Sequence, residues 1–247
     1  MGFEIGGKTA LVTGANRGIG KAIVEALLER GASKVWAGTR RAEALSALKA
    51  AHGDRLEVLK LDVTREDDIA AAARKATDVA LLVNNAGVAN VIGTPATDAE
   101  WLRVGRQEFD VNFFGSFAMS QAFAPALARN RGAIVNVVSV AGLVNFPILL
   151  SYSASKAALH SLTQGLRAGL KGQGIQVFGI YPGPVDTDMA KAIPMDKTPA
   201  KEVAEAILQG LAAGTEDIFP DRMARQFGEA FLKSPKAVEE QFASAGA

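Results

Sequence analysis

The fold of this chain is decided by the stretch that begins Lys8-Thr9-Ala10-Leu11-Val12 and continues Thr13-Gly14-Ala15-Asn16-Arg17-Gly18-Ile19-Gly20. Its first part is a short apolar strand, and an amphipathic helix with Ile23, Val24, Leu27 and Leu28 on one face follows the glycines. Backbone N–H groups at the start of a helix attract phosphate, and glycine permits a tight turn and a close ligand. The stretch therefore predicts a site for the pyrophosphate of a dinucleotide, with a plain glycine turn as the alternative.

Beyond this unit, apolar strands and amphipathic helices alternate along the chain. The expected strands are Lys34 to Gly38, Leu56 to Leu61, Val79 to Val83, Ala133 to Val138, Gln176 to Tyr181 and a short last one at Asp217 to Phe219. Such alternation predicts an α/β fold, a doubly wound parallel sheet of six to seven strands with helices on both faces. No repeat or linker is visible, so we expect one domain over residues 1–247. Its cofactor-binding part would span about 8–110, its catalytic and substrate part about 111–220, and its C-terminal helix and tail about 222–247.

The composition excludes several classes of function. The 27 basic and 26 acidic residues are interleaved and leave a net charge of +1, so neither nucleic acid nor an anionic membrane is an expected partner. The chain has no cysteine, which excludes disulfides and thiolate chemistry, and its two histidines are too few for a metal site. No apolar run approaches the ~18 residues of a membrane span and no leader pattern is present, so we expect a cytoplasmic protein.

A second informative stretch, from Ser139 to Lys156, reads Ser-Val-Ala-Gly-Leu-Val-Asn-Phe-Pro-Ile-Leu-Leu-Ser-Tyr-Ser-Ala-Ser-Lys. Tyr152 and Lys156 are four residues apart in a helical pattern that continues to about Leu170, so they share one face. Ser139 ends a strand, where side chains of an α/β sheet face the ligand. The pKa of a phenol is about 10, and it must fall by about 3 units, or roughly 4 kcal/mol, before the phenol can exchange protons near pH 7. An ammonium group about 4 Å away stabilises the phenolate by about 4 kcal/mol, which is only just enough. We therefore expect Lys156 to lower the pKa of Tyr152, with help from a cationic cofactor.

The end of the second strand predicts which dinucleotide binds. No Asp or Glu occurs between Glu29 and Glu43, and Arg40 stands where an acidic residue would hold the ribose of NAD. Arg40, with Arg17 in the glycine turn, suits a 2′-phosphate instead, unless both are simply solvated. At the end of the third strand, Asp62 either accepts from an adenine amino group or forms a local turn. Thr64 with Asp67 is expected to cap the helix Arg65 to Ala76.

The segment Gly105 to Ala128 is apolar nearly all round and is expected to be one long helix covered on both sides. Together with the helix from Ala154 to Leu170 it predicts the interface of a homodimer, with a tetramer left open. The chain ends in Glu216 to Pro220 and an expected terminal helix and tail from Arg222 to Phe242. Asn112 interrupts the apolar surface, and a polar side chain in such a place needs partners or a function.

These motifs together resemble the short-chain dehydrogenase/reductase family over about Lys8 to Met189. The glycine turn looks like the cofactor loop of the family, and Asn84-Asn85-Ala86-Gly87 matches its fourth-strand motif. Asn112, Ser139, Tyr152 and Lys156 fall in the order and spacing of its catalytic tetrad, and Pro182-Gly183 with Thr187 looks like its nicotinamide-side loop. The resemblance implies a Rossmann-type fold and an NADP-preferring, carbonyl-reductase-like member.

The family also implies roles for individual residues. Tyr152 would be the general acid for carbonyl reduction and the general base for alcohol oxidation, and Ser139 would donate to the carbonyl oxygen. Lys156 would also bond the nicotinamide ribose, and Asn112 would anchor a water molecule. The residues expected to bind NADP(H) are Gly14, Asn16, Arg17, Gly18, Ile19, Gly20, Arg40, Asp62, Val63, Asn85, Ala86, Gly87, Tyr152, Lys156, Pro182, Gly183, Val185 and Thr187.

The loops near Tyr152 predict the substrate. They offer an apolar lining and no extra Arg or Lys to hold an anionic group; the expected pocket residues are Val144, Phe146, Leu149, Met189 and Ile193. We therefore expect an NADPH-dependent oxidoreductase that reduces a small to medium apolar aldehyde or ketone, reversibly. The alternatives are an NAD-dependent alcohol or steroid dehydrogenase and, from another class, a non-catalytic protein that senses NADP.

Overall fold

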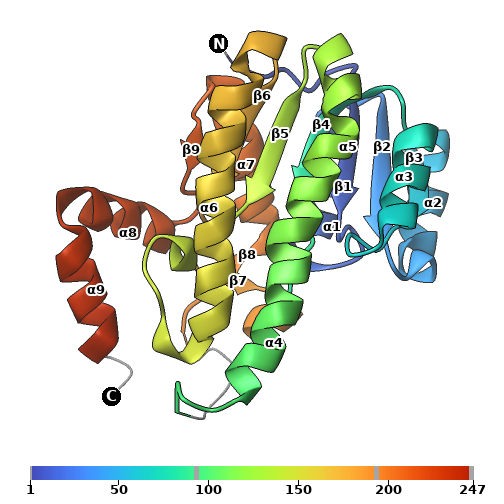
Figure 1. The fold of residues 1–247 in the computed structure, drawn as a ribbon. Helices are drawn as coiled ribbons and strands as arrows, with labels where there is room; N and C mark the ends of the chain where they lie inside the picture. Colours follow the sequence, from blue (N-terminus) through green and yellow to red (C-terminus); the bar gives the residue numbers. More distant parts are fainter. Residues whose placement is uncertain (1, 92–94, 192–194, 245–247) are drawn as a thin grey trace.

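The computed structural model describes residues 2–91, 95–191 and 195–244. Its centre is a seven-stranded, wholly parallel sheet in the order β3-β2-β1-β4-β5-β6-β9 (Figure 1). The strands are β1 (Thr9–Thr13), β2 (Lys34–Thr39), β3 (Leu56–Lys60), β4 (Val79–Asn84), β5 (Ala133–Val137), β6 (Gln176–Ile180) and β9 (Asp217–Ile218). The strand order reverses between β1 and β4, and open α/β sheets bind ligands in the crevice at such a point. The predicted doubly wound, Rossmann-type sheet is confirmed.

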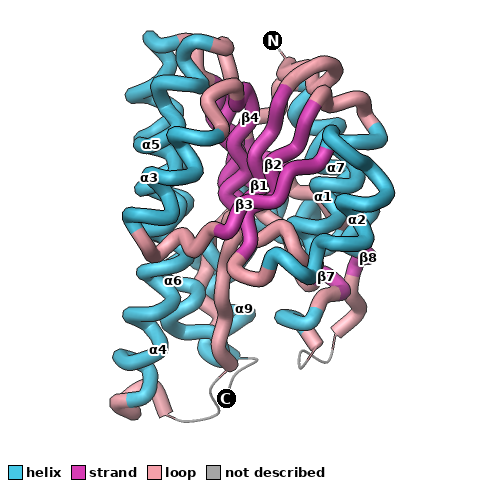
Figure 2. The backbone as a smooth tube through the Cα atoms, turned by 90° about the vertical axis from the view of Figure 1, so that its right-hand side faces the viewer, coloured by secondary structure: helices cyan, strands magenta, loops and turns pink. Residues whose placement is uncertain are grey.

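Helices cover both faces of the sheet (Figure 2). The helices on one face are α1 (Gly18–Glu29), α2 (Ser46–His52) and α7 (Ala200–Ala213); those on the other are α3 (Glu66–Lys75), α5 (Ser116–Arg129) and α6 (Leu150–Leu170). Each layer buries its own core against the strands: Leu27 and Ile207 lie in the first, and Met119 and Phe123 in the second. The strands are buried on both faces and read as continuous apolar runs for that reason.

The expected single helix from Gly105 to Ala128 is wrong in one respect. The structure has α4 (Glu100–Phe109), then a π-helical turn (Asp110–Gly115), and then α5. An extra residue in a helical turn changes the direction of the side chains around it, and such turns are frequent at functional sites. Asn112 lies in this turn and is completely buried.

The C-terminal region forms a separate small core. The expected terminal helix and tail from Arg222 to Phe242 form two helices, α8 (Arg222–Lys233) and α9 (Pro235–Ser244), which are separated before Pro235 because a proline cannot continue a helix. Phe146, Phe227 and Phe242 pack together there, with ring centroids 4.5–6.0 Å apart. A two-stranded parallel pair, β7 (Val185–Asp186) with β8 (Thr198–Pro199), packs against α7.

Short 3₁₀ turns complete the structure at Ala42–Leu45, Gly53–Arg55, Val140–Gly142, Pro147–Leu149, Lys171–Gln173 and Asp188–Ala190. Among the described residues, no helix combines the length and the apolar composition that crossing a membrane requires.

Candidate active site

A cavity of about 580 Å³ lies at the carboxyl ends of the strands. Its walls include every residue that the sequence predicts to bind the cofactor, together with Ser139. Segments far apart in the chain thus converge as the fold requires: the turn after β1, the ends of β2, β3 and β4, the stretch from Ser139 to Lys156, and the loop after β6. Arg40 follows β2 and Ser139 follows β5, and β1 and β4 lie between these two strands in the sheet, so the lining of the cavity spans the edge of the sheet from Arg40 to the residues around Ser139.

The glycine turn fits tightly against the segment after β4. Gly14 has φ +64°, and a Cβ there would lie 2.9 Å from the Cα of Ala86. A Cβ on Gly20 would lie 2.4 Å from the side-chain nitrogen Nδ2 of Asn85. Asn85 Nδ2 donates to the Thr13 carbonyl at 2.9 Å and to the Gly14 carbonyl at 3.2 Å, and the Thr13 hydroxyl accepts from the backbone of Asn85 and Ala86, each at 3.0 Å. Glycine is therefore required at both positions, and the two cofactor-side segments hold each other in place.

The start of α1 offers its N–H groups to the cavity. Its N-cap residue, Arg17, makes no side-chain cap hydrogen bond, and its first turn carries no acidic residue. The positive end of the helix dipole, with Gly18 and Ile19 in the cavity wall, suits an anion. The residues present therefore fit a dinucleotide pyrophosphate.

The two arginines at the far end of the cavity have different surroundings. Arg40 is exposed and lines the cavity. Arg17 also lines it, but its Nη1 lies 3.1 Å from Oδ2 of Asp188, which belongs to the loop that follows Thr187. A 2′-phosphate would have to compete with Asp188 for Arg17, so Arg40 is the better placed partner for it.

Asp62 is a turn former in this structure. Its Oδ1 accepts from the Thr64 N–H at 3.0 Å and from the Thr64 hydroxyl at 2.7 Å. Burial would raise the pKa of Asp62, but these hydrogen bonds and the charge of Arg40 outweigh it and lower the pKa. The expected cap by Thr64 is wrong: α3 begins at Glu66 without a side-chain cap, because the Thr64 hydroxyl is engaged with Asp62. Asp62 still lines the cavity, so its contact with an adenine amino group stays a prediction.

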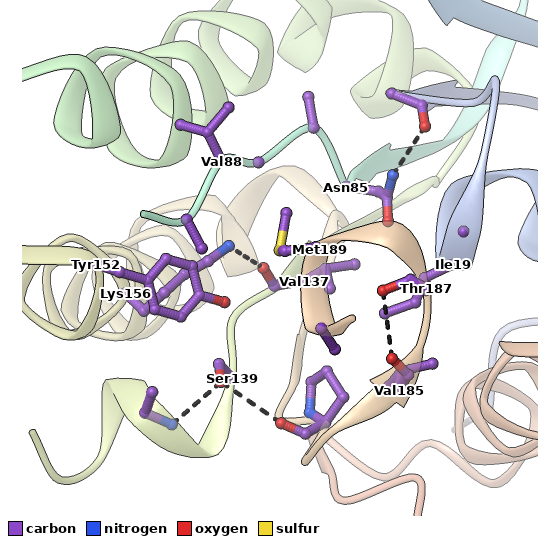
Figure 3. Close-up of a pocket in the computed structure, with 18 of the residues that line it drawn as sticks. Ile19, Asn85, Val88, Val137, Ser139, Tyr152, Lys156, Val185, Thr187 and Met189 are labelled. Carbon is purple, nitrogen blue, oxygen red and sulfur yellow. Dashed lines mark hydrogen bonds between the residues drawn. The ribbon is translucent and has the colours of Figure 1, made fainter. Parts of the chain in front are cut away.

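Ser139, Tyr152 and Lys156, here called the trio, meet at the other end (Figure 3). Tyr152 and Lys156 project from the same side of α6, and the Lys156 ammonium nitrogen lies 5.7 Å from the centre of the Tyr152 ring. Lys156 Nζ donates to the Val137 carbonyl at 2.8 Å, which fixes it below the end of β5. The Ser139 hydroxyl accepts from the Ala141 N–H at 3.1 Å and points its own hydrogen toward the Pro182 carbonyl at 3.5 Å, a long and weak contact.

The expected lowering of the Tyr152 pKa by Lys156 is wrong for the protein without a ligand. Burial raises the pKa of Tyr152 to about 12, although a hydrogen bond with the Ser139 side chain opposes it. The same burial lowers the pKa of Lys156 to about 7. Both groups lose water in one pocket, so the lysine tends to give up the charge that was expected to act on the phenol.

Asn112 stands behind the trio rather than in the cavity wall. Its Oδ1 accepts from the Val88 N–H, and its Nδ2 donates to the Val88 carbonyl and to the Ser155 hydroxyl, all at 2.9 Å. The side chain therefore joins the loop after β4 to α6. Its expected role in anchoring a water molecule stays a prediction.

Of the residues expected to contact the substrate, Phe146, Leu149 and Met189 line the same cavity, and their contact with a substrate stays a prediction. Val144 does not line the cavity: it is buried in the C-terminal core, because the 3₁₀ turn after Ser139 directs it inward. Ile193 lies outside the described residues.

The sequence interpretation missed several lining residues that come from distant segments: Val91, Ile148, Met195, Met223 and Phe242. Ile148 was recognisable as a neighbour of Phe146 and Leu149. No spacing rule connects Met223 or Phe242 to Tyr152, because the path of α8 and α9 decides their position. Among the described residues, no group of His, Asp and Glu side chains could hold a metal ion.

Comparison with known proteins agrees with this geometry. Residues 8–198 match the family model described as short chain dehydrogenase. Short-chain dehydrogenase PC-15 of Penicillium crustosum is 43% identical over 187 residues, which are 73% of this chain and 66% of that protein. The chain thus spans about two thirds of the length of that relative. Galactitol 2-dehydrogenase of Rhizobium johnstonii is 39% identical over 77% of each chain.

A solved structure shares both fold and sequence. The crystal structure of a short chain dehydrogenase from Burkholderia cenocepacia in complex with NADP is 39% identical, has a TM-score of 0.91, and is covered over 97% of this chain and 99% of that one. With the matching family model, the parallel sheet and the ordered motifs, this similarity shows that the chain belongs to the short-chain dehydrogenase family.

Proposed function

We propose that this protein is an NADP(H)-dependent oxidoreductase that reduces the carbonyl group of a small to medium apolar aldehyde or ketone, reversibly. One observation carries the proposal: a single cavity contains the trio at one end and Arg40 at the other, with the glycine turn between them. A bound nicotinamide would supply the hydride that is added to the carbonyl carbon.

The chain would supply the proton and the electrostatics. Negative charge grows on the carbonyl oxygen during reduction, and the Ser139 hydroxyl can turn from its weak contact with Pro182 to donate to that oxygen. The Tyr152 hydroxyl then gives its proton to the same oxygen, and the alcohol leaves. A phenol with a raised pKa is fully protonated near neutral pH and suits the role of acid. Positive charge from a bound cofactor would bring the pKa of Tyr152 down for the reverse reaction.

The substrate class follows from the lining. Around Ser139 and Tyr152 the described walls are built by aliphatic, aromatic and methionine side chains: Val91, Phe146, Ile148, Leu149, Met189, Met195, Met223 and Phe242. Such a surface favours an apolar molecule with one polar group. Three of the five methionines of the chain line this cavity, and their flexible thioethers adapt to differently shaped substrates.

The similarity to galactitol 2-dehydrogenase favours a second candidate, an NAD-dependent dehydrogenase that oxidises an alcohol. A polyol needs several hydrogen-bond partners, which the apolar walls do not offer, so a polyol is the poorer fit. A steroid-sized alcohol would suit the lining better.

Two further expectations accompany the proposal. The apolar faces of α4, α5 and α6 support a homodimer, with a tetramer left open. The neighbouring structure that contains NADP, together with Arg40, supports NADP(H) over NAD(H). The cytoplasmic location expected from the composition stays a prediction.

The decisive experiment follows NADPH and NADH consumption over a panel of apolar and polyol-derived carbonyl compounds. Tyr152→Phe should keep its fold and its affinity for NADPH but lose at least about 10²-fold in kcat, the usual effect of a lost general acid. Wild-type turnover by this variant would remove Tyr152 from the mechanism. Tight NADPH binding without turnover of any compound would favour the cofactor-sensing alternative.

A further inference from the structure

Glu108 is a buried carboxylate that the proposed reaction does not use. Its relative exposure is 0%, and it lies one helical turn before Asn112, near the end of α4. Its Oε1 accepts from the Asn90 backbone at 2.8 Å and from the Asn90 side chain at 3.1 Å. Its Oε2 accepts from the Ser151 hydroxyl at 2.5 Å. Three hydrogen-bond donors thus stabilise the buried carboxylate, which would be costly to bury without partners.

These contacts repeat those of Asn112 one turn away. Asn112 joins Val88 of the loop after β4 to Ser155 of α6, and Glu108 joins Asn90 of that loop to Ser151 of α6. The partners are spaced by two residues along the loop and by four along the helix. Two cross-links in parallel, one from α4 and one from the π-helical turn that follows it, thus join the loop to α6, and Tyr152 lies between their points of attachment on α6.

The close approach of α4 to α6 that this requires is permitted by Gly105. A Cβ on Gly105 would lie 3.1 Å from the Cβ of Ser151, a tight contact, and Gly105 is three residues before Glu108 on the same helix. Ser151 is the second residue of α6, where a negative charge is also favoured by the helix dipole.

We propose that Glu108 is a second positioning residue of this active site, which holds Tyr152 in place by joining the loop after β4 to the first turn of α6. The proposal rests on the proposed role of Tyr152. Catalysis is sensitive to small displacements of the acid, so removal of a cross-link beside it should reduce turnover more than stability.

The charge of Glu108 gives the proposal a specific signature. Three side chains act on Tyr152: Lys156 of α6 lies over its ring, Ser139 after β5 hydrogen-bonds with it, and the charge of Glu108 acts on it from α4. Burial is the main cause of the raised pKa of Tyr152, and the negative charge of Glu108 adds to it. A neutral side chain in place of Glu108 should therefore lower the pKa of Tyr152.

The test compares Glu108→Gln, Glu108→Ala and the control Glu100→Gln, the half-buried first residue of the same helix, whose carboxylate pairs with Arg103 instead of α6. Reduction of 4-nitrobenzaldehyde by NADPH is followed as a function of pH, with thermal unfolding and fluorescence titration of NADPH in parallel.

In Glu108→Ala we expect kcat to fall at least about 10-fold. In Glu108→Gln, which can keep the contacts with Asn90 and Ser151, we expect most of kcat to be retained near neutral pH. Its decline at high pH should begin roughly half a unit lower or more, because Tyr152 loses its proton more easily.

A direct reading of Tyr152 is available because the chain has only two tyrosines. Tyrosinate absorbance of the NADP⁺ complex should titrate at lower pH in Glu108→Gln, and Tyr152→Phe identifies the group that moves. The inference is overturned if both Glu108 variants keep the wild-type kcat and pH profile. It is equally overturned if their activity falls only in proportion to the folded fraction, with the profile unmoved. If Tyr152→Phe itself is fully active, the proposed function fails instead.

Discussion

At the scale of single residues, the burial of Lys156 opposes its positive charge. The side chain is 4% exposed, and burial lowers its pKa from 10.5 to about 7. An unfolded chain therefore binds a proton between about pH 7 and pH 10.5 that the folded chain has released. The free energy of unfolding should rise with pH across this window, because the cost of burying the charge disappears.

This predicts the behaviour of Lys156→Met in the protein without cofactor. The variant should be more stable than the wild type by a few kcal/mol near pH 7, and the difference should shrink toward pH 10. Tyr152 acts in the opposite direction only above about pH 10, where its raised pKa destabilises the folded state as pH increases. Urea unfolding at several pH values measures the difference. A gap that does not change with pH would mean that Lys156 is charged in the folded protein.

A second residue-scale prediction concerns Arg40. A hydrogen bond to a charged group is worth about 1.5–3 kcal/mol. Arg40→Ala should therefore lower kcat/KM for NADPH roughly 10-fold to 100-fold and leave kcat/KM for NADH nearly unchanged. Exposure of Arg40 places the effect toward the low end, and added salt should reduce it further. Asp188→Asn is the useful companion, because it releases Arg17 and should increase the preference for NADPH. Equal losses with both cofactors in Arg40→Ala would show a structural role.

At the scale of elements, α9 contributes Phe242 to the lining of the cavity. Phe242 lines the cavity and packs on Phe146 with ring centroids 4.5 Å apart. A helix at the end of a chain thus contributes to the pocket of a distant catalytic helix, and its sequence should influence substrate choice more than cofactor choice.

Phe242→Ala should therefore raise KM for a bulky aromatic ketone by roughly 10-fold, since one to two kcal/mol of apolar contact is lost. The NADPH dissociation constant should stay the same. Phe231→Ala is the matched control, because Phe231 packs against the same core without lining the cavity. If both variants change KM equally, the effect comes from the stability of the C-terminal core rather than from the pocket.

At the scale of the whole molecule, one face carries more apolar surface than its own sheet needs. Leu102 of α4 and Phe114 of the π-helical turn are 64% and 55% exposed. These residues adjoin α6, and the homodimer expected from the sequence would cover them.

Light scattering should accordingly give about twice 25.8 kDa at micromolar concentration. Phe114→Glu should shift the protein toward a monomer, because a charge would be buried in the interface. Leu232→Glu, at an 82% exposed position on α8, should leave the mass unchanged. A wild-type monomer at this concentration would refute the expected dimer.

The sequence alone determined the parallel sheet and the walls of the cofactor site. Apolar runs that end in small or polar residues fix strand and loop locally, and strands of a parallel sheet end at the same edge, so Gly14, Asn85 and Ser139 had to meet there. The spacing of Tyr152 and Lys156 on one helix is likewise a local property.

Only the tertiary structure decided the rest, because it depends on packing between segments that are distant in the chain. The π-helical turn that buries Asn112, the pairing of Arg17 with Asp188, and the arrival of Phe242 at the cavity follow from no local pattern. The pKa values of Tyr152 and Lys156 also depend on tertiary packing. The spacing in the sequence shows that the two groups are close, but it does not show how far burial removes both of them from water. Glu108 is the strongest case: in the sequence it is an ordinary helical glutamate, and the close packing of α4 on α6 at Gly105 brings it to Ser151.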